Sequence, residues 1–234
     1  MKVLIIGGSG YVGKMLLPLM KERHQIRIFD LFPPADKTVE FVEGGVNDES
    51  ALAKAMTGVD GVVYLAMGKD EKGQIDTVGP AYDVNVKGVH QACQAALNAG
   101  AKRLVYMSTL SVYADGGRRF CNEEEDRPDS PAVYGFTKAL GEEVCRMFGR
   151  ARGLNTISLR LNWPVEAGKW KEVYRQNPTS GATSGDDLAR AVLAALDCKE
   201  PGFNAFFITG DFEGRKINMS KAKQILGWEP LARP

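Results

Sequence analysis

The sequence predicts an α/β fold in which a doubly wound parallel sheet carries helices on both faces, followed by a small C-terminal lobe. Two observations predict it. Short β-branched runs alternate with longer segments of helical apolar periodicity, and the first such run ends in closely spaced glycines. Alternation of this kind is typical of a mostly parallel sheet, because parallel neighbours need helical crossovers between them. The 234 residues are sufficient to bury one sizeable core.

The expected strands are short runs rich in β-branched and aromatic side chains. In chain order they cover residues 2–6, 25–30, 38–42, 61–66, 103–108, 156–161 and 205–208. The longest helical patterns between them cover residues 11–22, 80–99 and 132–152. Residues 115–131 and 162–184 are the least regular, being rich in glycine, proline and charge, so we expect functional loops there.

Composition and charge exclude several classes of function. The 30 basic and 29 acidic residues leave a formal net charge of +1, so no global field attracts nucleic acid or an anionic membrane. The four cysteines form no CxxC pair and only two histidines accompany them, so we expect reduced thiols and no metal site. The first apolar run is too short for a signal peptide, and no later run approaches a membrane span. We therefore expect a cytoplasmic protein.

The opening segment MKVLIIGGSGYVG places Gly7, Gly10 and Gly13 directly after an apolar run and before a helical pattern. Glycine accepts the positive φ and the close backbone approach that a sharp strand-to-helix turn needs. Backbone amides at such a helix start bind a pyrophosphate, and Asp30, ending the next strand, accepts hydrogen bonds from ribose hydroxyls. An acid there repels a 2′-phosphate, so the pattern predicts a Rossmann-like NAD site and disfavours NADP.

A tyrosine and a lysine one helical turn apart, Tyr134 and Lys138, indicate proton-transfer chemistry. Residues i and i+4 share a helix face, so the lysine ammonium can lie near the phenol and favour the phenolate. We therefore expect a lowered pKa at Tyr134, which would let it accept a proton from a substrate hydroxyl. The strand at residues 103–108 ends beside Thr109 and Ser111, which places hydroxyls where α/β proteins bind ligands.

Eight motifs in register give the chain its resemblance to a known family. They are GGSGYVG at 7–13, Asp30, NVKG at 85–88, STLSVY at 108–113, YGFTK at 134–138, LRL at 159–161, GDDLA at 185–189 and LGWEP at 226–230. Together they resemble the extended short-chain dehydrogenase/reductase superfamily, the NAD-dependent epimerase/dehydratase family. The resemblance implies that residues 1–161 form an NAD-binding Rossmann domain. Residues 162–234 would form a reduced substrate-binding lobe, with strand 205–208 able to complete the sheet.

The resemblance also assigns roles to individual residues. It implies that Thr109, Tyr134 and Lys138 are catalytic, and that Asn85 lies near the nicotinamide. The cofactor-lining residues it implies, together with those of the glycine turn, are Gly7, Gly10, Tyr11, Val12, Gly13, Asp30, Leu31, Val46, Leu65, Ala66, Met67, Asn85, Met107, Tyr134, Lys138 and Leu161. The family often has Gly-Asp after its third strand, with the acid facing adenine. This chain has Gly44 and Gly45 there, so backbone near Val46 would take that place.

Departures from the family pattern narrow the reaction. Dehydratases of the family place Asp and Glu directly after the catalytic threonine, whereas this chain has Leu110 and Ser111, which disfavours dehydration. Relatives that epimerise at two carbons use a cysteine and a histidine, and no histidine lies in the C-terminal half of this chain. Hydride transfer remains, either ending as a dehydrogenase or returning to the other face as in 4-epimerases.

The resemblance is closest in size and local motifs to uronate dehydrogenases. Fewer residues follow Tyr134 than in nucleotide-sugar epimerases, so we expect a small, unlinked sugar or sugar acid as substrate. A uronate carboxylate favours an arginine fork, which Arg175 could supply. The candidate substrate residues are Lys69, Thr109, Ser111 and Arg175. Where uronate dehydrogenases read Ser-Ser-Asn-His, this chain reads Ser-Thr-Leu-Ser at 108–111, so the sugar itself is left open.

Two other functions stay open on the sequence alone. One is a compact nucleotide-sugar 4-epimerase with tightly bound NAD. The other is a non-catalytic NAD(P)-binding sensor, since one fold hosts many functions. In this superfamily the helices at 80–99 and 132–152 often pair across a two-fold axis, so we expect a homodimer. Apolar residues such as Val84, Val89, Leu140 and Val144 would serve either that interface or the sheet beneath it.

Overall fold

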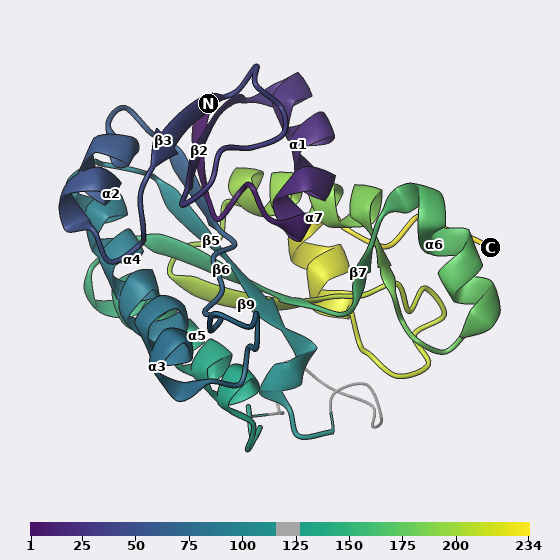
Figure 1. Cartoon of the computed structure of the whole chain (residues 1–234). Helices are drawn as coiled ribbons and strands as arrows, with labels where there is room; N and C mark the ends of the chain where they lie inside the picture. The colour runs from purple at the N-terminus through teal and green to yellow at the C-terminus, as the bar shows by residue number, and fades with distance from the viewer. Residues whose placement is uncertain (116–126) are drawn as a thin grey trace.

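The computed structural model describes residues 1–115 and 127–234 of the chain. Most of the irregular segment expected at 115–131 lies outside the described residues. Figure 1 shows a sheet with helices on both of its faces, and a smaller lobe on one side that contains α6. Within the described ranges, no helix is long and apolar enough to cross a membrane.

The central sheet has seven strands in the order β3-β2-β1-β4-β5-β6-β9. Its strands are β1 (Lys2–Ile6), β2 (Gln25–Asp30), β3 (Glu40–Glu43), β4 (Gly61–Tyr64), β5 (Arg103–Thr109), β6 (Asn155–Leu161) and β9 (Phe203–Ile208). Every neighbouring pair runs parallel. The strand order reverses between β1 and β4, as in a doubly wound sheet. The expected fold class is therefore confirmed.

Helices cover both faces of this sheet (Figure 1). Helices α1 (Tyr11–Arg23) and α7 (Gly185–Asp197) pack together on one face. Helices α2 (Glu49–Met56), α4 (Gly88–Asn98) and α5 (Val133–Ala151) cover the other. Strand β1 shows why both faces are needed: Val3 and Ile5 enter one core while Leu4 and Ile6 enter the other. A strand buried on both sides has to be apolar throughout, as this one is.

The helix expected at 80–99 is not one regular helix. It consists of α3 (Val78–Tyr82), a π-helical turn η1 (Asp83–Lys87) and α4. A π-turn widens the helix by one residue, and such turns occur often at functional sites. Here it brings Asn85, which is fully buried, against the interior.

Residues 162–184 are more regular than expected. They contain β7 (Pro164–Val165), helix α6 (Ala167–Gln176) and β8 (Thr183–Ser184), and β7 pairs with β8. The expectation of a loop was wrong. Because α6 buries only a narrow apolar face, few of its residues carry the apolar periodicity that indicates a helix. Trp170, Val173 and Tyr174 supply that face, and they pack in a small satellite core with Ala182 and Phe212.

The remaining described elements are the 3₁₀ turn η2 (Leu110–Val112) and the π-helical turn η3 (Ala222–Leu226). The segment after η3 returns to α7, where the Trp228 indole donates to the Asp187 carbonyl oxygen at 2.9 Å. The Asp187 carboxylate accepts from the backbone N–H groups of Leu231 at 2.9 Å and Ala232 at 3.0 Å. These contacts attach the C-terminal segment to the main body.

A buried ion pair joins α5 to β6 behind the sheet edge. The Arg160 guanidinium donates to the Glu142 carboxylate through Nη2 at 2.7 Å and Nε at 3.0 Å, and also donates to the Tyr113 hydroxyl. Arg160 is 2% exposed and Glu142 1% exposed. The Ser158 hydroxyl donates to the same carboxylate at 3.1 Å, so the buried Glu142 charge is both paired and hydrogen-bonded.

Replacing Glu142 with glutamine should destabilise the protein by about 3 to 5 kcal/mol, because the substitution removes the buried carboxylate charge that pairs with the Arg160 guanidinium. The free energy of unfolding in urea measures the loss. Glu143→Gln is the matched control, since the Glu143 and Arg146 side chains are 62% and 38% exposed and their pair contributes about 0 to 1 kcal/mol. Equal losses in the two variants would contradict a structural role for the buried pair.

Candidate active site

A cleft of about 1020 Å³ opens at the carboxyl ends of the central strands. Its wall is built from the ends of β1, β2, β4, β5 and β6 and from the start of α5. It therefore lies where the strand order reverses, which is the place at which open α/β sheets bind ligands. The volume suits a cofactor together with a small substrate.

The glycine turn between β1 and α1 brings backbone close to the cleft. Gly7 has φ +78°, and a Cβ there would lie 2.6 Å from the backbone nitrogen of Ala66 on the neighbouring strand end. A Cβ on Gly13 would lie 2.1 Å from the carbonyl oxygen of Gly8, so this glycine permits helix–strand packing and does not line the cleft. Gly10 does line the cleft, and a Cβ there would meet only the Gly7 oxygen at 3.4 Å.

Asp30 ties the glycine turn to the loop after β2. Its Oδ2 accepts from the Ser9 backbone N–H at 2.9 Å and its Oδ1 from the Phe32 N–H at 3.3 Å. The Ser9 hydroxyl also donates to the Phe32 carbonyl oxygen at 2.6 Å. The carboxylate is thus held in the cleft wall at the end of β2, the position expected to face an adenosine ribose.

The wall fits a dinucleotide. The first N–H groups of α1 have no partner inside the helix and open toward the cleft at Tyr11 and Val12. The Ser108 hydroxyl, 3% exposed and in the same wall, has no hydrogen-bond partner within the described protein, so a bound polar group would satisfy it. The expected cofactor residues that line the cleft are Gly7, Gly10, Tyr11, Val12, Asp30, Leu31, Val46, Leu65, Ala66, Met67, Met107, Tyr134, Lys138 and Leu161.

Asn85 lies behind the cleft wall, where it supports α5. Its Oδ1 accepts from the Gly68 N–H at 3.2 Å, and its Nδ2 donates to the Thr137 hydroxyl at 3.0 Å. Thr137 lies on α5 between Tyr134 and Lys138. Asn85 therefore connects the segment after β4 to the helix that carries the predicted catalytic residues.

Thr109, Tyr134 and Lys138 all line the same cleft, as the sequence predicts. Thr109 is the last residue of β5, and the other two come from the first turns of α5. The backbone N–H of Tyr134 donates to the Asp76 carboxylate at 2.8 Å, which fixes the start of α5. Sequence reasoning missed Asp76, because only the fold brings the segment before α3 beside α5.

The pKa of Tyr134 does not move in the expected direction. Burial raises the pKa of its phenol, a hydrogen bond with Thr109 opposes that rise, and the Asp76 carboxylate adds to it. Burial also lowers the pKa of Lys138 to about 7, with the Glu142 carboxylate opposing the change. The expectation that the lysine would lower the pKa of Tyr134 in the free protein is wrong, since desolvation is the larger effect on both groups.

The Lys138 ammonium lies against an aromatic ring, and no carboxylate among residues 1–115 and 127–234 forms an ion pair with it. It lies 4.4 Å from the centroid of the Tyr106 ring, and the residue is 3% exposed. A ring face attracts a cation, although less strongly than a carboxylate does. The geometry therefore permits either charge state near neutral pH.

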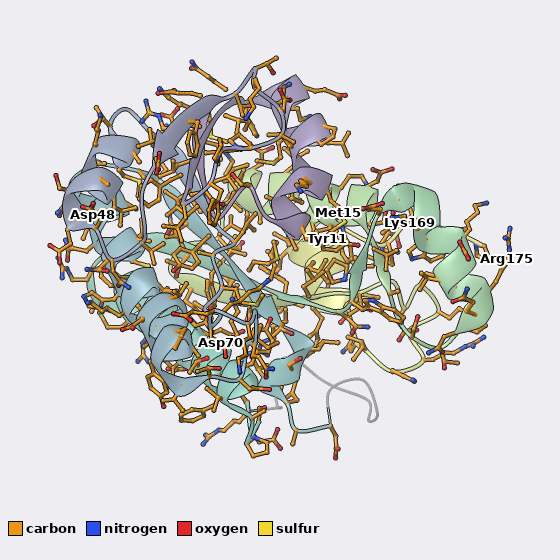
Figure 2. The ribbon with its side chains drawn as sticks, in the orientation of Figure 1. Tyr11, Met15, Asp48, Asp70, Lys169 and Arg175 are labelled. Atoms are coloured by element: carbon orange, nitrogen blue, oxygen red, sulfur yellow. The ribbon has the colours of Figure 1, made fainter. Side chains whose placement is uncertain are left out.

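The expected substrate residues divide into two groups. Lys69 and Thr109 line the cleft, whereas Ser111 and Arg175 do not. Ser111 belongs to the turn η2, where its backbone N–H donates to the Thr109 hydroxyl at 3.1 Å. Arg175 is exposed on α6, and Figure 2 shows it at the outer side of the lobe, far from Tyr11. The structure does not bring it to the cleft, because the segment expected to be a loop forms a helix.

Several wall residues were not predicted from the sequence, among them Ser9, Lys14, Phe32, Ser108, Trp163 and Pro164. Phe32 and Trp163 are large apolar side chains that are 71% and 51% exposed. An aromatic residue two positions after β6 and directly before a proline was the available signal for Trp163. Sequence reasoning ended the cofactor wall at Leu161 and so missed it.

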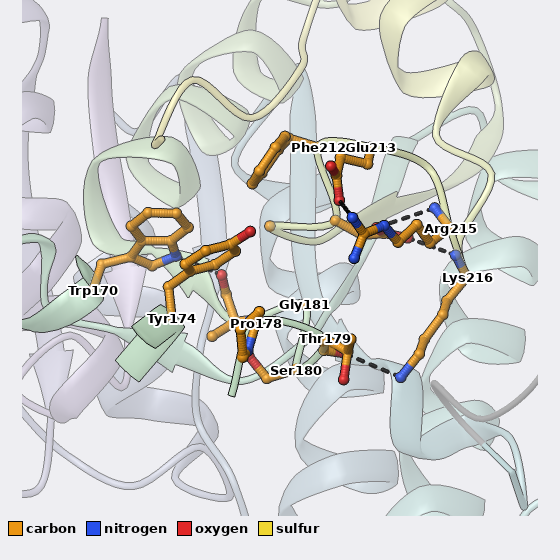
Figure 3. A pocket seen from close by; sticks show the side chains of 13 residues that line it. Trp170, Tyr174, Pro178, Thr179, Ser180, Gly181, Phe212, Glu213, Arg215 and Lys216 are labelled. Carbon is orange, nitrogen blue, oxygen red and sulfur yellow. Dashed lines mark hydrogen bonds and ion pairs between the residues drawn. The ribbon is translucent and has the colours of Figure 1, made fainter. Parts of the chain in front are cut away.

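A second pocket lies in the lobe, between α6 and the residues after β9 (Figure 3). Trp170 and Tyr174 stack along one side with ring centroids 5.3 Å apart. On the other side, the Lys216 ammonium donates to the Thr179 carbonyl oxygen at 3.0 Å. The free volume of this pocket, about 20 Å³, accommodates roughly one water molecule. The pocket is therefore part of the lobe's packing and too small for a sugar.

The sequence model described as "NAD dependent epimerase/dehydratase family" matches residues 3–170, which include the glycine turn, Thr109, Tyr134 and Lys138. The chain belongs to this family. The match ends within α6, so the family assignment covers the central cleft, while the later part of the lobe lies beyond it.

Known proteins are similar to this one in sequence or in fold along nearly its whole length. L-arabinose 1-dehydrogenase (NAD(P)(+)) of Haloferax volcanii is 27% identical over 98% of this chain and 96% of its own. A short-chain dehydrogenase/reductase superfamily protein from Agrobacterium tumefaciens, solved with NAD bound, has a TM-score of 0.82 at 21% identity, covering 100% of this chain and 93% of its own. A uronate dehydrogenase variant from the same organism, also complexed with NAD, has a TM-score of 0.80 at 20% identity. The match covers 99% of this chain and 84% of the uronate dehydrogenase chain.

Replacing Lys138 with methionine should remove a pH-dependent contribution to stability. The folded pKa of about 7 lies below the ordinary lysine value, so between those pKa values the unfolded chain binds a proton that the folded protein has lost. Wild-type stability should therefore rise relative to Lys138→Met above pH about 7, with a slope of at most about 1.4 kcal/mol per pH unit. Below that pH the burial penalty is fully present.

Urea unfolding of both proteins across this pH range measures the difference, in which other titrating groups cancel. Lys199→Met is the control, because Lys199 is exposed and its substitution should give a curve parallel to the wild type. A Lys138→Met curve that is also parallel would contradict a lowered pKa.

Proposed function

We propose that the protein is an NAD-dependent oxidoreductase that transfers hydride between nicotinamide and a secondary or anomeric hydroxyl of a small sugar or sugar acid. The observation that carries the proposal is the meeting of Thr109, Tyr134 and Lys138 in one wall with the glycine turn and Asp30. The similarity to a sugar dehydrogenase along nearly all of both chains supports it. So does the shared fold of a uronate dehydrogenase.

The protein's own residues would bind and orient the substrate and move its proton. The Thr109 hydroxyl, at the end of β5 and hydrogen-bonded to Tyr134, can orient the reacting hydroxyl beside the phenol. Tyr134 then accepts the hydroxyl proton as general base. Bound NAD would supply the hydride acceptor, held by the glycine turn and Asp30.

Positive charge close to Tyr134 is needed for that step, because burial raises the pKa of the phenol. Lys138, one helical turn further along α5, is the residue placed to supply it. Burial lowers its pKa to about 7, so that charge can be lost within the physiological pH range. The proposed mechanism therefore makes activity sensitive to the protonation of a lysine as well as of the tyrosine.

Partners and location stay predictions. Val89 is fully buried in the core, which is the second of the two places expected for it. The side chains on α3 and α5 that remain available are Val78, Tyr82, Phe136 and Met147, which are exposed by 59%, 40%, 46% and 38%. These exposed apolar residues support a homodimer through α3 and α5.

We also retain the proposed division into a cofactor domain at 1–161 and a substrate lobe at 162–234, and a cytoplasmic location.

Purified protein incubated with NAD and a panel of free sugars should show absorbance growing at the reduced-nicotinamide band. The panel includes L-arabinose, D-glucuronate, D-galacturonate and simple polyols. Tyr134→Phe should lower the rate at least about 100-fold, because the variant cannot accept the hydroxyl proton. Tyr174→Phe, a matched change in the lobe core, should leave the rate close to that of the wild type.

A flat trace across the panel would contradict the proposed dehydrogenase. The alternative is a 4-epimerase, which would convert a nucleotide sugar with no net change in absorbance, and that conversion would also depend on Tyr134. Intact NAD binding without turnover of either class of substrate would favour the non-catalytic sensor.

Cofactor choice is a separate expectation, in which Asp30 favours NAD over NADP. Asp30→Asn removes the charge that would repel a 2′-phosphate but keeps an oxygen able to accept from Ser9. The ratio of kcat/KM for NADP to that for NAD should rise about tenfold or more. Asp36→Asn makes the same change of charge outside this cleft and should leave the ratio unaltered. An unchanged ratio in Asp30→Asn would mean that the carboxylate does not select the cofactor.

A further inference from the structure

Trp163 has a backbone conformation that its side chain does not favour. Its φ is +28°, and within residues 1–115 and 127–234 every other residue with positive φ is a glycine. A bulky side chain in that region costs of order 1 to 3 kcal/mol, whereas glycine accepts it without strain. Strained residues of this kind persist where the surrounding structure fixes them, and they concentrate at binding sites.

The surroundings of Trp163 do fix it. The Asn162 amide donates to the carbonyl oxygens of Ser180 and Gly181, both at 2.9 Å. The Thr183 hydroxyl donates to the Asn162 carbonyl oxygen at 2.6 Å, and the Thr183 N–H donates to the Trp163 carbonyl oxygen at 3.0 Å. The backbone that carries the indole is thus bonded to the lobe, so the position from which the side chain projects is set before any ligand arrives.

The indole is placed at the reacting end of the cleft. Thr109 pairs with Leu161 across β5 and β6, so Trp163 follows within two residues of the strand end opposite the predicted catalytic threonine. Trp163 and Pro164 line the cleft together with Tyr134. Trp163 is 51% exposed, while the other two tryptophans, Trp170 and Trp228, are 3% and 1% exposed and donate to carbonyl oxygens.

We propose that Trp163 is a specificity-determining residue whose indole packs against the apolar C–H face of a ring sugar while Thr109 and Tyr134 bind its reacting hydroxyl. This inference rests on the proposed function and names the feature of the substrate that the cleft selects. A pyranose presents hydroxyls around its edge and C–H groups on its face. A rigid aromatic plane beside hydroxyl groups complements both, through dispersion on one side and hydrogen bonds on the other.

The first test is steady-state kinetics of Trp163→Phe and Trp163→Ala with L-arabinose and D-glucuronate. Trp163→Ala should raise KM for the sugar that the wild type oxidises by about tenfold or more, with Trp163→Phe intermediate. The Kd for NAD, measured by calorimetry, should change less than about twofold. Unchanged KM in Trp163→Ala would overturn the inference and leave the proposed function standing. A weakened Kd for NAD would also overturn it, by making Trp163 a cofactor residue.

Trp163→Gly separates the loss of the indole from misfolding. It removes the same ring as Trp163→Ala but relieves the strained backbone, so its Tm should be higher by a few degrees. If both variants raise KM equally despite different stability, the effect belongs to the side chain. If KM follows stability instead, the inference fails.

Tryptophan fluorescence tests binding without requiring turnover. The exposed indole should be quenched by the bound sugar in the wild type and in Tyr134→Phe, and the response should vanish in Trp163→Phe but survive in Trp170→Phe. A wild type that oxidises no sugar would defeat the proposed function. Quenching confined to proteins that retain Trp163 would still support the ring contact, and its absence would overturn the inference as well.

Discussion

The close approach of α5 to the face of the sheet at β5 is the constraint on which the site depends. A Cβ on Gly141 would lie 2.4 Å from the Tyr106 hydroxyl and 2.6 Å from the Asn85 carbonyl oxygen, so any larger residue would push α5 away from β5 and η1. Nearer the start of α5, a Cβ on Gly135 would lie 1.9 Å from the Ser111 carbonyl oxygen. These two glycines fix how deep the helix lies, and with it the position of Tyr134 and Lys138 beside Thr109.

Depth of burial then determines the electrostatics. Tyr134, Lys138 and Glu142 follow one another at four-residue spacing along the buried face of α5, and Arg160 of β6 neutralises the last of them. The Glu142 carboxylate raises the Lys138 pKa, but desolvation lowers it by more, so the pKa still falls to about 7. A helix packed less closely would leave Lys138 solvated and fully charged. The same packing that positions Tyr134 thus makes the charge of Lys138 depend on pH near neutrality.

The sequence predicts the parts of this structure that depend on local patterns. The glycine turn, Asp30 and the strand ends follow from spacing alone, and the family motifs identify Thr109, Tyr134 and Lys138. The π-turn at 83–87 has no such signal, because one extra residue in a helical turn leaves the apolar periodicity nearly intact. The pKa of Tyr134 was misjudged because charge proximity can be read from i, i+4 spacing, whereas desolvation depends on packing by distant segments.

Substrate recognition is least predictable, because it depends on which of residues 162–184 reach the cleft, and only Trp163 and Pro164 line it. Arg175 has suitable chemistry for a sugar acid, but the periodicity of α6 turns it outward while Trp170 enters the lobe core. Trp163 has no charge and belongs to no motif, yet hydrogen bonds from Asn162 and Thr183 hold its neighbouring backbone in place. Under the proposed function, a described wall that combines an exposed indole with Thr109, Tyr134 and Lys69 would select the shape of a sugar ring more than the charge of its substituents. Selectivity for a carboxylate would then rest mainly on Lys69, a cation of the described wall that the proposed proton transfer does not use.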